Sequence, residues 1–208
     1  MFVTVEGGEG VGKSTFVEGL CRSLKSKGIE LIRTFEPGGC DSANSIRNLF
    51  LNPPQSDPLF KETELFLVSA ARAQHMKRVI LPALAAKHWV ICDRFHDSTR
   101  VYQGKLGGLP DRFVDEVIGL SVNGRDPDIT LLLDCDLDVM TQRLKNRAAS
   151  SASEPSRFDN ESLAFHAKLK NAYLELAARF PARIHIINAN GSPEQVLRSA
   201  IQKIEERR

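Results

Sequence analysis

Residues 7–14 read Gly-Gly-Glu-Gly-Val-Gly-Lys-Ser and fit the pattern G-x-x-x-x-G-K-[ST]. A short apolar run, residues 2–6, comes directly before them, and a helical pattern follows them. Glycines in such a loop allow backbone N–H groups to surround a phosphate, and the N-terminus of the following helix adds positive potential. The sequence therefore predicts a phosphate-binding loop, or P-loop, at residues 7–14.

The side chains of this loop predict a site for a nucleoside triphosphate. Lys13 would supply a mobile cation, and the Ser14 hydroxyl is placed to bind a Mg²⁺ ion that bridges the β- and γ-phosphates. The predicted nucleotide-binding residues are Gly7, Gly8, Glu9, Gly10, Val11, Gly12, Lys13, Ser14 and Thr15. The motif alone leaves open whether the protein hydrolyses, transfers or only senses the triphosphate.

Five short runs rich in apolar or β-branched residues predict the strands. They lie at residues 2–6, 30–35, 89–93, 129–134 and 183–188. Because the runs are continuous rather than alternating, each strand is expected to be covered on both faces, as in a parallel sheet. The fold class predicted is α/β: a three-layer P-loop NTPase fold with a five-stranded parallel sheet flanked by helices.

Helical patterns separate these strands. Apolar residues recur at helical spacing from Val17 to Leu24, and Gly28 follows at a position typical of a helix end. A long helical stretch at 62–87 contains Pro82, which should kink it or start a new helix. Two further helices are predicted around residues 165–176 and 197–204.

Length and composition restrict the class of protein. The 208 residues predict one domain spanning 1–208, and the balance of 28 Lys and Arg against 26 Asp and Glu argues against a non-specific polyphosphate binder held by a large basic field. The four cysteines lack metal or redox spacing and are expected to be reduced thiols. No stretch is long and apolar enough to span a membrane, so a cytoplasmic location is expected.

A second polar motif follows the predicted strand at 89–93. Asp93 and Arg94 come at its carboxyl end, the edge at which ligands gather in open α/β sheets. Asp93 could orient Mg²⁺ or its waters, and Arg94 could hold a phosphate through two hydrogen bonds. The alternative is an ordinary surface ion pair.

Short motifs in a fixed order carry a resemblance to a known family. They are residues 2–7 leading into the P-loop, 36–39 (Glu-Pro-Gly-Gly), 72–75 (Arg-Ala-Gln-His), 93–95, Ser98, 102–104 (Tyr-Gln-Gly), 127–130 and 173–177. Over nearly the whole chain this order resembles thymidylate kinases, which use ATP and Mg²⁺ to phosphorylate dTMP to dTDP in dTTP synthesis. The resemblance also implies a homodimer that binds dTMP and ATP, with no nucleic acid or membrane partner.

The resemblance implies roles for the acceptor side of the site. Glu9 would receive the 3′-hydroxyl of dTMP, Arg47 and Arg94 would grip its phosphate, and Arg72 would hydrogen-bond the thymine. Gln103 matches a base- or sugar-side contact, and Tyr102 would wall the sugar pocket and disfavour a 2′-hydroxyl. The remaining substrate-binding positions that it implies are Glu36, Pro37, Val68 and Ser98.

The chain departs from the family pattern in four places. Val68 stands where an aromatic residue commonly stacks on thymine, and Phe66, about 200° around a helix from it, faces almost the opposite way. Phe35 replaces a usual arginine, and Cys40 replaces a usual threonine. The predicted mobile lid, about 143–158, is longer than typical.

The lid is also where the resemblance implies a catalytic arginine, because Lys13 is the only basic residue of the P-loop. Arg147 and Arg157 are the candidates, with Arg143 third. Together with Lys13, Arg94 and Asp93 they make up the predicted catalytic set, and Ser14 and Asp93 are the predicted Mg²⁺ ligands.

Two other functions remain open from the sequence. A nucleoside kinase on the same scaffold would need a carboxylate base near the 5′-hydroxyl, a role that Glu36 could fill. A P-loop regulatory ATPase would hydrolyse ATP slowly without any acceptor and would leave the arginine cluster without a role.

Overall fold

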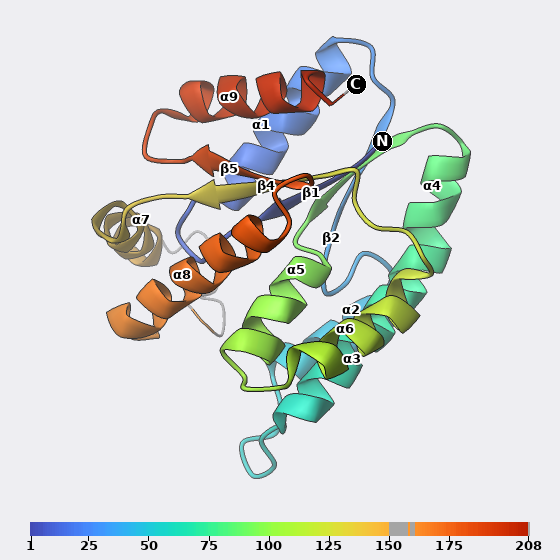
Figure 1. Ribbon diagram of the computed structural model, residues 1–208, viewed down its shortest axis with the longest axis vertical. Helices are drawn as coiled ribbons and strands as arrows, with labels where there is room; N and C mark the ends of the chain where they lie inside the picture. The colour runs from blue at the N-terminus through green and yellow to red at the C-terminus, as the bar shows by residue number, and fades with distance from the viewer. Residues whose placement is uncertain (150–157, 159–160, 208) are drawn as a thin grey trace.

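A parallel sheet forms the centre of the computed structural model, which describes residues 1–149, 158 and 161–207 (Figure 1). Its strands are β1 (Phe2–Glu6), β2 (Leu31–Phe35), β3 (Trp89–Asp93), β4 (Ile129–Asp134) and β5 (Ile184–Asn188), in the order β2-β3-β1-β4-β5. The predicted fold class is confirmed. Three strands have the predicted bounds, and β2 and β5 each begin one residue later than predicted.

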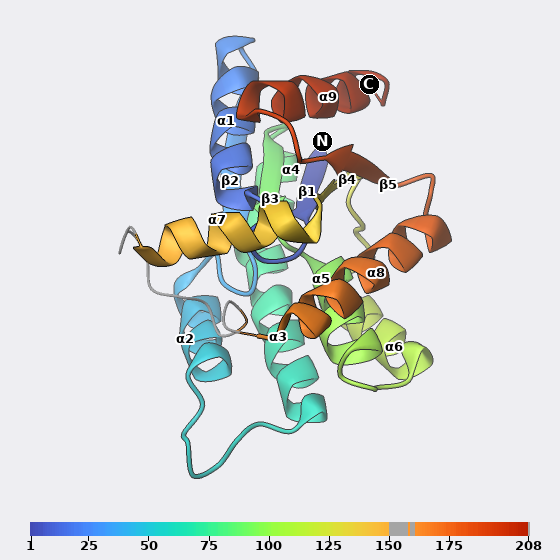
Figure 2. The ribbon, with the colours of Figure 1, turned by 90° about the vertical axis from the view of Figure 1, so that its left-hand side faces the viewer.

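Helices cover both faces of this sheet (Figures 1 and 2). They are α1 (Lys13–Ser26), α2 (Asp41–Leu51), α3 (Lys61–His75), α4 (Leu81–Ala85), α5 (His96–Thr99), α6 (Asp111–Val122), α7 (Leu137–Ala149), α8 (Leu163–Arg179) and α9 (Pro193–Glu205). Two π-helical segments, η1 (Met76–Ile80) and η2 (Arg100–Lys105), continue α3 and α5. Helices α1 and α9 lie on one face, and α3, α6 and α8 lie on the other.

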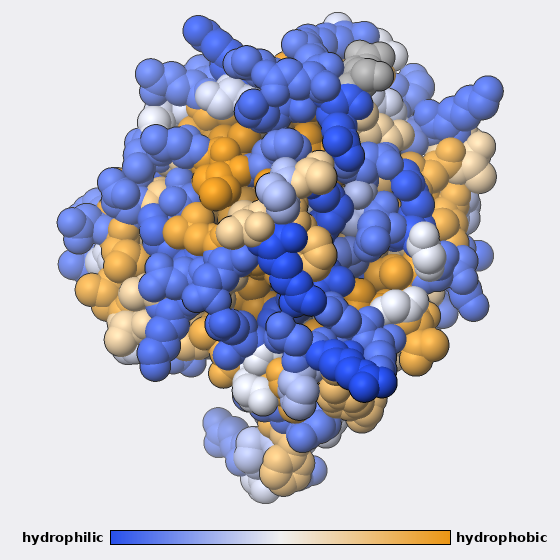
Figure 3. All heavy atoms as spheres, in the orientation of Figure 1, coloured by the Kyte–Doolittle hydropathy of each residue, from blue (hydrophilic) through white to orange (hydrophobic). Residues whose placement is uncertain are grey.

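Alternate residues of β1 build the two cores. Val3 and Val5 pack with α1 and α9, whereas Phe2 packs with Leu65 of α3 and Ile118 of α6. All five residues of β1 are buried, as expected for a strand covered on both faces. Figure 3 shows that the outer surface on the α8 side is mainly hydrophilic, with apolar side chains scattered between.

The long helical stretch divides as the proline predicts. Helix α3 ends at His75, η1 follows, and α4 begins at Leu81 with Pro82 in its first turn, where a missing N–H leaves no bond unmade. Helix α6 was not predicted, although Val114, Ile118 and Val122 are buried at helical spacing.

The predicted lid begins inside a helix, because α7 extends to Ala149 and includes residues 143–149. Residues 150–157, including Arg157, lie outside the described residues.

Three strand ends meet at the carboxyl edge of the sheet. Val5 pairs with Asp93 in the register of β1 and β3. The Arg94 N–H donates to Val5 O at 2.9 Å, and the Glu36 N–H donates to Asp93 O at 2.9 Å. The backbone itself therefore brings the P-loop, Arg94 and Glu36 to neighbouring positions.

All four cysteines carry free thiols, as predicted. Among the described residues, no helix is both long enough and apolar enough to cross a membrane.

Candidate active site

The P-loop closes around its own lysine. Gly7 has φ +140°, and a Cβ there would lie 2.6 Å from Leu133 O, so only glycine fits. Lys13 Nζ donates to Gly7 O at 2.9 Å and to Gly8 O at 2.7 Å. Burial and the neighbouring Arg94 lower the pKa of Lys13 to about 8. A phosphate in the loop would offset both effects, because its negative charge favours the ammonium form.

A cavity of about 1830 Å³ extends from the P-loop to the carboxyl ends of β2 and β3. Single small-molecule sites usually measure about 300–1,000 Å³, so this cavity has room for two nucleotides. The predicted site residues that line it are Glu9, Gly10, Val11, Gly12, Lys13, Ser14, Thr15, Glu36, Pro37, Arg47, Val68, Arg72, Asp93, Arg94, Ser98, Tyr102, Gln103, Arg143 and Arg147. Gly7 and Gly8, the first two residues of the loop, line a separate small cavity on the α8 side instead.

Arg94 connects the P-loop to the rest of the cavity. Its Nη1 donates to Gly7 O at 3.0 Å, Ser98 Oγ at 3.2 Å and Tyr173 Oη at 3.1 Å. Its Nη2 donates to Glu9 Oε1 at 2.7 Å, and the guanidinium lies over the Tyr102 ring. These contacts exclude the surface-ion-pair alternative for Arg94.

Glu9 points inward and is 7% exposed. Its Oε2 accepts from the Tyr102 hydroxyl at 2.8 Å. Burial by itself would raise the pKa of Glu9, but the charges of Arg94 and Lys13 hold it below its ordinary value. The Glu9 carboxylate therefore lies between the P-loop and Tyr102, where it can accept a hydrogen bond from a ligand hydroxyl.

Glu6 and Tyr173 support Arg94, and neither was predicted as a functional residue. Glu6 Oε2 accepts from Ser98 Oγ at 2.6 Å and from Tyr173 Oη at 3.2 Å, and its Oε1 accepts from the Phe95 N–H at 2.8 Å. The signal in the sequence was a lone carboxylate at the end of a buried strand. Such a group needs several donors.

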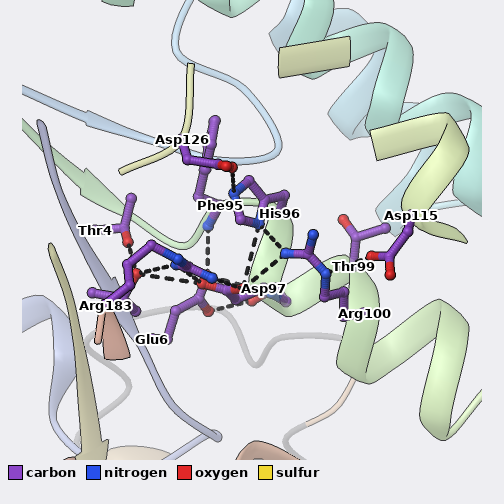
Figure 4. Close-up of polar contacts among 12 residues, drawn as sticks. Thr4, Glu6, Phe95, His96, Asp97, Thr99, Arg100, Asp115, Asp126 and Arg183 are labelled. Atoms are coloured by element: carbon purple, nitrogen blue, oxygen red, sulfur yellow. Dashed lines mark hydrogen bonds and ion pairs between the residues drawn. The ribbon is translucent and has the colours of Figure 1, made fainter. Parts of the chain in front are cut away.

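Behind Glu6 lies a buried charge network centred on Asp97 (Figure 4). Arg183 Nη2 donates to Asp97 Oδ1 at 2.8 Å, and Arg100 Nη1 donates to the same atom at 3.1 Å. Burial would raise the pKa of Asp97, but His96 and Arg183 hold it well below its ordinary value. Burial and the charge of Asp97 raise the pKa of Glu6.

Arg72 lies at the far end of the cavity and is 2% exposed. Its Nε donates to Glu36 Oε2 at 2.8 Å and its Nη2 donates to Thr99 Oγ1 at 2.8 Å. Its Nη1 is buried without a hydrogen-bond partner in the described chain. An unsatisfied buried donor of this kind indicates that a ligand supplies the acceptor.

Glu36 is not available as a general base. Oε2 is bound by Arg72, and Oε1 lies 3.0 Å from His75 Nδ1, which donates to it because a carboxylate only accepts. His75 is in turn fixed by Thr34, whose Oγ1 lies 2.6 Å from Nε2. These contacts argue against the nucleoside kinase alternative, which needs a free carboxylate.

The wall between Arg72 and Arg94 comes from α3 and η2. Val68 and, from η2, Tyr102 and Gln103 line the cavity. Such π-helical segments are rare and frequent at functional sites. Phe66 is 52% exposed and packs edge-on against Phe113 of α6, so it takes no part in the cavity, as the helical geometry predicted.

Arg47 and the two residues next to it in space form another part of the wall. Arg47 Nη1 donates to Pro37 O at 2.8 Å, and its guanidinium lies 5.3 Å from the centre of the Phe35 ring. Phe35 does not supply the positive charge of the arginine that is usual at its position. Its ring instead packs against the guanidinium of Arg47 at the cavity wall.

The residues present fit a Mg²⁺ ion. Asp93 Oδ1 is buried and has no hydrogen-bond partner among the described residues, and Ser14 is exposed at the start of α1. Both line the cavity. Mg²⁺ is commonly held by one or two protein oxygens together with substrate phosphates and waters, which matches this donor set.

The three lid arginines differ in position. Arg143 Nη1 donates to Val11 O at 3.1 Å and Nη2 donates to Ala189 O at 2.9 Å, so Arg143 joins the P-loop to the segment after β5. Arg147, further along α7, is exposed and lines the cavity. Arg157 lies outside the described residues.

Comparisons with known proteins agree on one family. The family described as thymidylate kinase matches residues 5–200. The chain is 44% identical over 206 residues to a thymidylate kinase of Chromohalobacter salexigens, covering 99% of this chain and 95% of that protein. It is 43% identical over 207 residues to one of Desulfosudis oleivorans, covering 99% and 96%.

The fold gives the same result. The crystal structure of thymidylate kinase from Ehrlichia chaffeensis matches with a TM-score of 0.79 at 29% identity, over 98% of each chain. This chain therefore belongs to the thymidylate kinase family.

Proposed function

We propose that this protein transfers the γ-phosphoryl group of ATP to dTMP and releases ADP and dTDP. The observation that carries the proposal is the contact between Arg94 and the P-loop at 3.0 Å inside one cavity. A phosphate held by Arg94 lies next to the phosphates that the P-loop holds. This is the arrangement that in-line transfer requires.

The acceptor end fits dTMP. Arg94 and Arg47 supply two positive charges for its phosphate dianion, and Glu9 accepts from the 3′-hydroxyl. Tyr102, held by Glu9, packs against the sugar and leaves little room for a 2′-hydroxyl. Arg72 Nη1, the buried donor without a partner, donates to a carbonyl oxygen of the base.

The donor end holds the triphosphate through the backbone N–H groups of the P-loop and through Lys13. Ser14 and Asp93 would hold Mg²⁺, which neutralises phosphate charge when bound. Arg147 or Arg157 would add positive charge to the transferring group from the lid side. Arg143 shapes the cavity between the P-loop and Ala189.

The transfer needs no general base from the protein. A phosphate monoester is already ionised near pH 7, so one of its oxygens attacks the γ-phosphorus while the bond to the β-phosphate oxygen of ATP breaks. Positioning and charge neutralisation then supply the catalysis. The full occupation of Glu36 by Arg72 and His75 is consistent with this mechanism.

We further propose that the protein acts in the cytoplasm as a homodimer. Support for the dimer comes from large apolar side chains on neighbouring helices α3 and α6, where Phe66 is 52% and Leu120 is 86% exposed. Light scattering on the purified protein measures the mass that decides between monomer and dimer.

An ADP-release assay tests the function. We expect rapid release with dTMP, little with thymidine, dCMP or dGMP, and almost none without an acceptor. Equal rates with and without dTMP would favour the regulatory ATPase, and thymidine as the better acceptor would favour a nucleoside kinase.

A further inference from the structure

Gln103 is held from behind by a buried carboxylate. Gln103 Nε2 donates to Glu64 Oε2 at 3.1 Å, and Glu64, in α3, is 1% exposed. Lys61 Nζ donates to both Glu64 carboxylate oxygens at 3.3 Å. Since a carboxylate only accepts hydrogen bonds, the amide of Gln103 must turn its NH₂ group towards Glu64.

This orientation determines what Gln103 presents to the cavity. The amide oxygen Oε1 receives no hydrogen bond from the described chain, while Gln103 itself lies in the cavity wall. Arg72 Nη1, in the same wall, is a donor without a partner there. The wall therefore offers a ligand one acceptor and one donor.

A 2,4-dioxopyrimidine matches this pair. Thymine and uracil carry a donor, N3–H, beside an acceptor, O4. Cytosine carries the reverse, an acceptor at N3 beside an amino donor at C4, and would place acceptor against acceptor and donor against donor. A mismatch between buried polar groups weakens the binding of a ligand far more than the loss of an apolar contact does.

We propose that Glu64 is a positioning residue for base selection: by fixing the orientation of the Gln103 amide, it makes the site accept N3–H pyrimidines and reject cytosine. This proposal rests on the proposed dTMP kinase function. Glu64 is absent from the cavity wall, so its effect reaches the base only through Gln103.

The variant Glu64→Gln tests the proposal. It keeps the size of the side chain but can donate as well as accept, so the Gln103 amide can turn over. Two kinetic quantities are measured: KM for dTMP, and the inhibition constant of dCMP against dTMP. We expect the selectivity ratio, defined as the inhibition constant of dCMP divided by the KM for dTMP, to fall by about tenfold, which corresponds to roughly one hydrogen bond.

Two controls isolate the amide. Lys61→Ala removes the ammonium beside Glu64 but keeps the contact between Glu64 and Gln103. It should leave the selectivity ratio within about twofold of wild type, because the Lys61 side chain is itself 44% exposed and does not contact Gln103. The ratio of KM values for dTMP and dUMP should stay constant in every variant, because these bases differ only in a methyl group.

The outcomes are separable. An unchanged selectivity ratio in a Glu64→Gln protein that melts like wild type would overturn the proposal. Equal weakening of dTMP and dCMP binding would overturn it as well. If Glu64→Gln does not fold, Glu64→Asp, which withdraws the carboxylate from Gln103, must show a smaller fall in the same ratio. Failure of the wild-type protein to phosphorylate dTMP would instead refute the proposed function.

Discussion

Arg94 has a backbone conformation, φ +65°, that residues other than glycine rarely adopt. Such a conformation costs about 1–3 kcal/mol and persists where the surroundings hold it in place. Here the Arg94 N–H donates to Val5 O, and the guanidinium binds Gly7 O and Glu9. The strained backbone of Arg94, at the end of β3, therefore directs its guanidinium to the P-loop, which follows the neighbouring strand β1.

The Tyr173 hydroxyl orients this charge. It accepts from Arg94 at 3.1 Å and donates to Glu6 at 3.2 Å. We expect Tyr173→Phe to lower kcat/KM for dTMP by about tenfold, the value of one hydrogen bond to a charged group, and to leave the KM for ATP unchanged. Steady-state kinetics with each substrate varied in turn checks this, and equal losses for both substrates would contradict it.

At the scale of elements, the Asp97 network joins α5 to the sheet and to the loop before β5. Asp97 and Arg100 come from α5 and η2, Arg183 precedes β5, and Thr130 of β4 accepts from Arg183 Nη1 at 2.7 Å. The network lies directly behind Glu6 (Figure 4). It therefore supports the start of α5, from which Ser98 reaches Arg94.

Loss of Arg183 should destabilise the fold. Arg183→Leu leaves Asp97 buried with Arg100, His96 and the Thr130 hydroxyl as its remaining partners. Removal of one partner from a buried ion pair costs about 3–5 kcal/mol, and we expect a loss of about 3 kcal/mol because these partners remain. Urea unfolding measures this change in the free energy of unfolding. The effect should be full at neutral pH and shrink in acid, because a carboxylate with a depressed folded pKa loses its stabilisation as the pH falls through that pKa.

Arg179→Leu is the matched control. Arg179 also packs on Phe180, but its partners Asp111 and Asp115 are more exposed, and its own side chain is 46% exposed. Exposed pairs contribute about 0–1 kcal/mol. Equal destabilisation by the two variants would show that burial of Asp97 does not decide the stability of this region.

At the scale of the whole molecule, one cavity joins structures from distant parts of the chain. The P-loop forms one end, and α3 and η2 form the other. The two ends have different chemistry: backbone N–H groups and Lys13 at the first, and Arg72 with Gln103 at the second. Two different ligands can therefore bind at once.

Simultaneous binding predicts additive thermal stabilisation. Each ligand at about 100 times its Kd should add about 2.7 kcal/mol and raise Tm by about 5–10 °C for a chain of this size. A non-hydrolysable ATP analogue and dTMP together should raise Tm more than either alone in differential scanning fluorimetry. Lys13→Ala should reduce the shift with the ATP analogue and keep the shift with dTMP, whereas no additional shift with both ligands would indicate one shared site.

The sequence by itself determined the sheet, the P-loop and the helices α1, α3, α8 and α9, because these depend on local patterns. Strand runs, helical spacing and the glycines of residues 7–14 each lie within one short segment. The motif at Asp93 and Arg94 was assigned to the sheet edge for the same reason: it directly follows an apolar strand, and parallel strands end at one edge.

The tertiary structure alone decided which side chains support the site. Tyr173 meets Glu6 across 167 residues of sequence, and Gln103 meets Glu64 across 39. No local pattern marks either pair, since each partner lies on a different element. What brings them together is the packing of α8 and η2 against the sheet and α3, and the need of each buried carboxylate for donors, which only the folded chain can supply.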